Sequence, residues 1–229
     1  MPSRYRARAA LLAVALALVA GCGGSDEDNG GASTTPAANE TSTTATADAP
    51  RLGDPLSTIA SLPGALKSEP PWPANNGSSL QLRMRAIGLA PLSEEGQVLH
   101  IHQHLDLFVD GRPVTMPANI GIDADGGFIS DLHTHETDGI LHVESPTQRD
   151  FTLGQFFAVW GLPLSANTIG GLRETGAKKL RVWVNATEVT ADPTSIVLAE
   201  HQEIVIAYGT DAQVPDPLPK SFDFEALGL

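Results

Sequence analysis

One run of alternating residues constrains the fold more than any other part of this chain. Between Val98 and Val109, three histidines and an aspartate occupy successive even positions, whereas the odd positions are aliphatic except for Gln103. Side chains of a β-strand alternate between its two faces, so the pattern predicts a strand with one apolar face and one face of imidazoles. That second face carries His100, His102, His104, Asp106 and Phe108.

Turn signals predict that this strand opens a set of hairpins. Asp110-Gly111 separates it from a second strand over residues 112–116. Asp138-Gly139 separates a strand over 128–136 from another over 140–144. An Asp-Gly pair between two such runs is a strong signal for a β-hairpin.

Later segments predict a helix and two more strands. Thr152 and Gln155 have the spacing of a capping box, which would open a helix that ends at Gly161. Residues 180–184 and 203–207 have the composition of strands. We therefore expect an α+β fold, mainly antiparallel β with one or more short helices.

The second hairpin carries His133, His135, His142 and Glu144, and its register decides which of them face one another. A turn of Asp138-Gly139 alone places His135 opposite His142 and His133 opposite Glu144, with all four on one face. A three-residue loop would instead turn His133 and His135 toward the apolar face. We prefer the first register because it separates polar from apolar side chains more cleanly, and that separation sets register.

The clustered histidines predict a transition-metal site. Neutral imidazole binds Zn, Cu, Ni and Fe, and two histidines at i and i+2 on a strand can close on one ion. Carboxylates beside them can complete the shell or fix the histidine tautomer. Zn(II) or Cu(II) is the expected ion. The predicted ligands are His102, His104, His133, His135 and His142, with His100, Glu144 and Asp106 as additional candidates and His100 outside the shell as the alternative.

The first 22 residues resemble the export signal of bacterial lipoproteins. Arg4, Arg6 and Arg8 precede twelve residues, 9–20, that carry no polar side chain, which is too short for a membrane span of about 20 residues. Val19-Ala20-Gly21-Cys22 resembles a lipobox, in which the cysteine is acylated after cleavage. This resemblance implies a signal peptide over residues 1–21, a lipid on Cys22, and a place in a cell membrane facing outside the cytoplasm.

Composition divides the remainder of the chain. Residues 22–50 contain no large apolar side chain, so we expect a disordered stalk, with a reach on the order of 30 Å. Residues 51–78 are rich in proline and are expected to lie loosely on the surface of a single β-rich domain over 79–229. Cys22 is the only cysteine, which excludes disulfides, thiolate metal sites and a cysteine nucleophile. The formal charge of −13 excludes nucleic acid as a partner.

Several phrases together resemble a family of uncharacterised, histidine-rich, secreted or lipid-anchored prokaryotic proteins. They include His102-Gln-His104-Leu-Asp106, Pro117-Ala-Asn-Ile-Gly121, His133-Thr-His135 and Gly139-Ile-Leu-His142-Val-Glu-Ser145, and the resemblance covers about residues 79–210. It implies one self-contained domain and assigns no activity.

The sequence therefore predicts a lipid-anchored, extracytoplasmic protein that binds a transition metal, with a role in metal binding, delivery or sensing. A metal-dependent enzyme is the alternative, with Glu136 or Glu144 as general base beside an open coordination position. An interaction module with a structural histidine network is a third. We prefer the hypothesis of metal binding without catalysis. The sequence identifies no catalytic residue and no protein partner.

Overall fold

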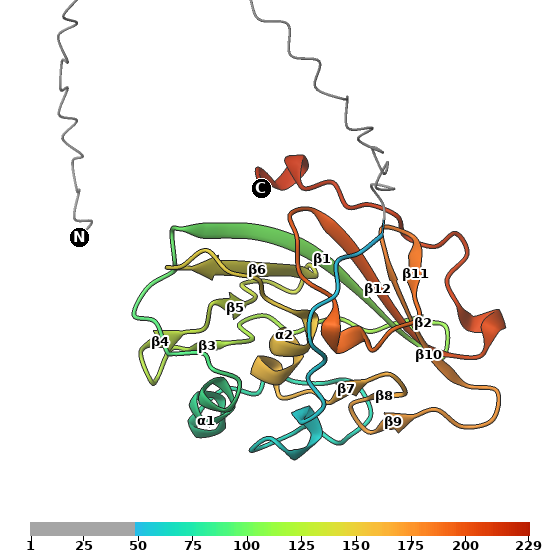
Figure 1. Ribbon diagram of the computed structural model, residues 1–229. Helices are drawn as coiled ribbons and strands as arrows, with labels where there is room; N and C mark the ends of the chain where they lie inside the picture. The colour runs from blue at the N-terminus through green and yellow to red at the C-terminus, as the bar shows by residue number, and fades with distance from the viewer. Residues whose placement is uncertain (1–48) are drawn as a thin grey trace, which may run out of the picture. The chain divides into compact units, whose positions relative to one another are not determined.

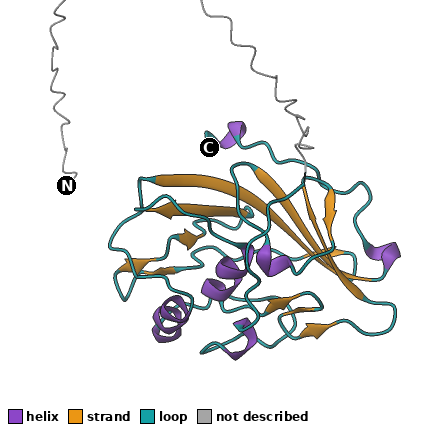
Figure 2. Ribbon diagram, viewed as in Figure 1, coloured by secondary structure: helices purple, strands orange, loops and turns teal. Residues whose placement is uncertain are grey.

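A computed structural model describes residues 49–229 of the protein. The expected signal peptide, Cys22 and nearly all of the expected stalk lie outside the described residues. Figures 1 and 2 show a sheet of long strands with helices and short strands on one side of it, and the C-terminal segment on the other.

Helices are few and short in the described residues. Two are α-helices and four are single 3-10 turns: α1 (Ser78–Ala86), α2 (Leu153–Trp160), η1 (Ile59–Ser61), η2 (Pro193–Ser195), η3 (Asp211–Gln213) and η4 (Glu225–Leu227). Within residues 49–229, no helix has the length and apolar character that crossing a bilayer requires.

Strands form one large sheet and two small ones. The large sheet has the order β11-β10-β12-β1-β6-β5, with β2 also paired to β1; β3 pairs with β4, and β7, β8 and β9 form a third sheet. The strands are β1 (Leu99–Val109), β2 (Arg112–Pro113), β3 (Ile122–Asp123), β4 (Phe128–Ile129), β5 (Leu132–His133), β6 (Ile140–Ser145), β7 (Leu164–Ser165), β8 (Thr168–Ile169), β9 (Leu172–Arg173), β10 (Lys179–Val184), β11 (Thr187–Val189) and β12 (Gln202–Gly209).

The centre of the large sheet is a parallel pair within a mainly antiparallel arrangement. β1 runs parallel to β12, whereas β1–β6, β5–β6 and β10–β12 pair antiparallel. Together with the two short α-helices this is an α+β fold, mainly antiparallel β, and the predicted fold class is confirmed.

The apolar face of β1 packs toward α2, as the alternation predicts. Leu105 and Leu107 are buried in one core with Phe156, Phe157 and Trp160 of the helix. Burial of such side chains stabilises a fold by about 1.5–3 kcal/mol each. The sheet is therefore fixed by this face, and the histidine face is left for other contacts.

The local signals around α2 act as predicted. Thr152 Oγ1 accepts a hydrogen bond from the Gln155 amide, and Gln155 Oε1 accepts one from the Thr152 amide, which completes the capping box. Gly161 ends the helix with a φ of 75°, in the left-handed region that favours glycine. The predicted helix is confirmed.

A buried arginine ties α1 to the carboxyl end of α2. Arg83 donates hydrogen bonds from Nε to the Ala158 carbonyl (3.1 Å) and from Nη2 to the Val159 carbonyl (3.0 Å). It also donates to the carbonyl groups of Pro63 and Asn75. Burial lowers the pKa of Arg83 to about 10, which leaves it charged at neutral pH.

The first predicted hairpin is present, and the register predicted for the second is wrong. β1 and β2 join through Asp110 and Gly111, both with positive φ. In the second hairpin, β5 is only two residues long and His133 pairs with His142. The observed register therefore differs from the predicted one by two residues. A slip of two keeps every side chain on its face, because side chains alternate with a period of two.

The proline-rich segment 51–78 is held more firmly than the sequence suggests. Ile59 and Trp72 are buried in the core, and the rings of Trp72 and Trp160 meet edge to face at 6.4 Å. Leu52 also forms a β-bridge to Ile196. The expectation that this segment lies loosely on the surface is therefore wrong. The apolar residues of this segment are few and widely spaced, so their sequence pattern does not show that they pack into one core.

The C-terminal segment packs on the face of β1 that bears the histidines. Val214 and Leu218 lie against a small cluster that includes Phe108, and Phe222 stacks on the His104 ring with centroids 4.1 Å apart. Figure 1 shows this segment, coloured red, on the opposite side of the sheet from α2. The buried members of the small cluster are Trp183, Val205 and Ala207.

Candidate metal centre

The pairing of β1 with β6 brings the first four candidate ligands together. His102 lies directly opposite His142, and His100 lies opposite Glu144. Side chains at directly opposite positions of an antiparallel pair have Cβ atoms about 4.5–5.5 Å apart, so both pairs are in contact. The same alternation that buries Leu105 thus presents these four side chains on one face.

β5 adds the remaining two histidines from the other side of β6. His133 is opposite His142, and their rings stack with centroids 5.2 Å apart. His135 follows in the loop, with its ring centroid 4.6 Å from that of His142. His142 therefore lies between the β1 histidines and the β5 histidines.

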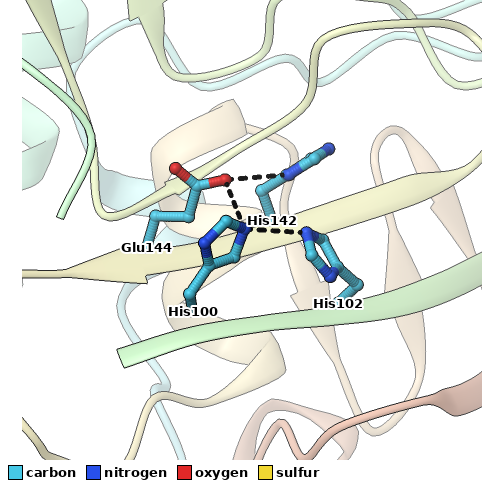
Figure 3. A group of neighbouring side chains, drawn as sticks. All are labelled: His100, His102, His142 and Glu144. Carbon is cyan, nitrogen blue, oxygen red and sulfur yellow. Dashed lines mark hydrogen bonds and ion pairs between the residues drawn. The ribbon is translucent and has the colours of Figure 1, made fainter. Parts of the chain in front are cut away.

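In the first group, His100 and His142 contact the Glu144 carboxylate, and His102 contacts His100 (Figure 3). Oε1 of Glu144 is 3.1 Å from His142 Nδ1 and 3.3 Å from His100 Nε2. His100 Nε2 is in turn 3.1 Å from His102 Nε2. Each of the four residues offers one ligand atom, and these atoms all lie within 4.8 Å of one another.

A second group shares two of the same residues. It consists of His133, His135, His142 and Glu144, again with donor atoms within 4.8 Å. His133 Nε2 is 3.2 Å from His135 Nε2 and 3.9 Å from Glu144 Oε1. Two donors bonded to one ion at about 2.0–2.1 Å with tetrahedral angles lie about 3.3 Å apart, so the Nε2 pairs have the spacing of ligand pairs.

Hydrogen bonding prepares His133 to act as a ligand. Its Nδ1 lies 3.0 Å from the Ser130 carbonyl oxygen, which can only accept, so Nδ1 carries the proton. The lone pair of the neutral ring is then on Nε2, which faces His135. A carbonyl acceptor behind a histidine ligand commonly fixes the tautomer that a metal needs.

Burial keeps two of the histidines neutral. It lowers the pKa of His133 to about 3, and burial together with the neighbouring His142 and His100 lowers that of His102 to about 4. Metal ions bind the neutral form of imidazole. Both rings therefore offer lone pairs at neutral pH without losing a proton.

Glu144 is a buried carboxylate with only one of its two oxygens hydrogen-bonded among the described residues. Its side chain is 3% exposed, and Oε2 has no hydrogen-bond partner among the described residues. Burial raises the pKa of this carboxyl, but the hydrogen bond from His142 and the charges of nearby histidines outweigh it and lower the pKa. An ionised, partly unpartnered carboxylate in such a place is destabilising unless a cation or donor compensates it.

His104 faces the same side of β1 but lies outside both groups. Its Nε2 donates to the Asp138 carbonyl (3.1 Å), and its Nδ1 pairs with Glu203 Oε2 at 2.9 Å. Burial opposes protonation of His104, yet the hydrogen bond and charge of Glu203 raise its pKa; burial also raises the pKa of Glu203. His104, Asp106 and Glu203 form a third group that can hold a metal, although both His104 nitrogens already have partners.

Gly139 allows His104 to take this position. A Cβ at residue 139 would lie 2.7 Å from His104 Nε2, and the φ of 88° at Gly139 belongs to the region that favours glycine. The glycine of the predicted turn thus also accommodates a side chain from the neighbouring strand.

The structure gathers most of the predicted ligands and adds others. His100, which the sequence placed at the margin, is part of the first group. Glu136, the candidate general base, is exposed and belongs to none of the three groups. Glu203 and Glu95, whose Oε1 is 3.3 Å from His135 Nε2, were missed. Neither shows a sequence signal, because each reaches the cluster from a distant segment.

Comparisons of the chain with models of protein families, with curated proteins and with solved structures gave no match. Function must therefore be argued from the site.

Proposed function

We propose that this protein binds a transition metal, Cu(II) or Zn(II), outside the cytoplasm, tethered to a membrane by a lipid on Cys22. Its role is metal binding, delivery or sensing. One observation carries the proposal: five imidazoles and one buried carboxylate meet in two groups whose donor atoms lie within 4.8 Å. Anchoring rests on the lipobox resemblance of residues 19–22.

The composition of the donor set favours these two ions. Imidazole nitrogen suits Zn and Cu, whereas Mg and Ca prefer shells made of oxygen. The order of affinities among divalent ions places Cu(II) above Zn(II) for a given set of nitrogen ligands. We therefore expect both ions to bind, with Cu(II) the tighter.

Binding is favoured over catalysis by where the acidic groups lie. Glu144 is surrounded by histidines, which suits a ligand, and Glu136 is exposed. Cavities of about 340 to 750 Å³ open elsewhere on the described surface, and none of these is lined by a histidine.

Metal content tests the proposal. The mature chain with Cys22→Ser would be stripped with a chelator, equilibrated with Cu(II) or Zn(II), desalted, and assayed by elemental mass spectrometry. We expect at least one equivalent of metal, and a rise in melting temperature, because a ligand that binds only the folded state stabilises it. A His142→Ala variant removes the one histidine that both groups share and should retain far less metal.

Circular dichroism of His142→Ala would show that loss of metal does not come from unfolding. His201→Ala is the matched control, since this histidine belongs to neither group. A parent protein that retains neither ion would overturn the proposal.

A further inference from the structure

The cluster holds more donors than one ion of the expected kind uses. Five imidazoles and one carboxylate make six, whereas Zn(II) in proteins almost always takes four ligands. One ion with four ligands would leave two of these six groups without a metal bond, which is costly for any of them that is buried. The number of donors alone therefore raises the question of a second ion.

The donors also divide into two chelating pairs. His100 and His102 come from β1, with Nε2 atoms 3.1 Å apart, and His133 and His135 come from β5 and its loop, with Nε2 atoms 3.2 Å apart. Each distance is that between two ligands of a single ion. Each pair is thus one edge of a coordination shell.

The two pairs do not converge on one point. Donors bonded to one ion at about 2.1 Å can be no more than about 4.2 Å apart. The six residues fall into two overlapping quartets within the 4.8 Å limit, and the β1 pair and the β5 pair belong to different quartets. Only His142 and Glu144 belong to both.

Glu144 lies where a bridging ligand would be needed. Its Oε1 is 3.3 Å from His100 Nε2 and 3.9 Å from His133 Nε2, one nitrogen from each pair. Its Oε2 is buried and has no hydrogen-bond partner in the described part of the chain. Two-metal sites hold their ions about 3.5–4 Å apart, and a carboxylate between them reduces their mutual repulsion.

We propose that the cluster is a centre for two transition-metal ions bridged by Glu144. His100 and His102 hold one ion, and His133 and His135 hold the other, with Glu95 as an additional acidic group beside His135. His142 lies within reach of both ions. This inference rests on the proposed function and adds its stoichiometry and its bridging residue.

Two exposed histidines allow a test that spares the core. The side chains of His100 and His135 are 47% and 39% exposed, and that of His201, the control, is 44% exposed. Zn(II) and, separately, Cu(II) would be titrated into the metal-free chain carrying Cys22→Ser, with native mass spectrometry and calorimetry as readouts. We expect two equivalents to bind in the parent and in His201→Ala.

Each variant should affect its own ion. His100→Ala should weaken one binding step at least tenfold and leave the other, and His135→Ala should do the reverse, so that the double variant weakens both. Glu144→Gln should weaken both steps in a folded protein. One equivalent in the parent, or the same single step weakened by either variant, would overturn the two-ion centre and leave the proposed function standing. No equivalent would overturn both.

Discussion

At the scale of single residues, the buried histidines make stability depend on pH. His102 and His133 are 6% and 0% exposed, and burial is the first cause of pKa values of about 4 and about 3 in the folded state. An unfolded histidine titrates near 6.5. The unfolded chain therefore takes up protons between pH 6.5 and 4 that the folded protein excludes.

We expect the free energy of unfolding of the metal-free protein to fall as the pH drops through this window. Because the unfolded state binds more protons there, each histidine should contribute on the order of 1–2 kcal/mol of loss by pH 5. Urea unfolding at pH 7 and pH 5 measures it. His133→Asn, which retains a donor for Ser130, should show a smaller loss, and His201→Ala should match the parent. If the parent, His133→Asn and His201→Ala all lost the same free energy of unfolding, the buried His133 would not be a cause of the pH dependence.

At the scale of secondary-structure elements, Arg83 acts as the carboxyl-terminal cap of α2. It lies in α1 yet donates to carbonyl groups of the last turn of α2, where a positive charge also interacts favourably with the helix dipole. The Ala158 carbonyl also accepts from the Gly161 amide, but Arg83 is the only donor to the Val159 carbonyl among the described residues. One side chain therefore fixes the angle and contact between the two helices.

Arg83→Met should keep the volume of the side chain and remove its hydrogen bonds. We expect a loss of about 2–4 kcal/mol in the free energy of unfolding, since the buried Val159 carbonyl and the part-buried carbonyl groups of Pro63 and Asn75 lose the Arg83 donor. Chemical denaturation with the metal-free protein measures this, and Arg85→Met, on the exposed side of α1, is the control. A loss below about 1 kcal/mol would show that water satisfies these carbonyl groups.

Local signals predicted the elements well. The alternation of β1, the Asp110-Gly111 turn and the capping box at Thr152 each depend on residues a few positions apart, and the structure has all three. The grouping of His133 with His142 was also predictable, because faces alternate strictly along strands.

Pairings between distant segments were not predictable. β5 ends after His133, and the loop to β6 is longer than a two-residue turn, so a pattern of faces cannot distinguish registers that differ by two. Glu203 meets His104 across 99 residues of sequence, and no local pattern marks it. The sequence places Trp72 in a proline-rich connecting segment and gives no sign that its ring packs against that of Trp160.

At the scale of the whole molecule, the proposed anchor favours association with a membrane, and the acidic charge of the chain opposes it. The chain carries a formal charge of −13, which disfavours contact with anionic lipid headgroups. Association with a membrane would then depend on the lipid alone. Residues 23–50 contain no large apolar side chain that would add to this attachment.

Intact mass spectrometry of the protein from a bacterial membrane fraction tests the anchor. We expect a chain that begins at Cys22 and carries added acyl mass, and incorporation of a labelled fatty acid. Cys22→Ser should lose the label, because the chain has no other cysteine, and Ser25→Ala should keep it. A first residue other than Cys22, or a mass without acyl chains, would contradict the lipobox interpretation.

The parallel pairing of β1 with β12 also bears on the order of assembly. β1, β5 and β6 lie within residues 99–145 and can associate early, but β1 gains a neighbour on its other edge only when residues 202–209 are available. Pairings of such high contact order form slowly. A chain threaded outward through a membrane would complete its sheet only after its C-terminal strand had emerged. Under the proposed export, the ligands would meet the ions of the outer compartment first, and location as well as affinity would select the metal.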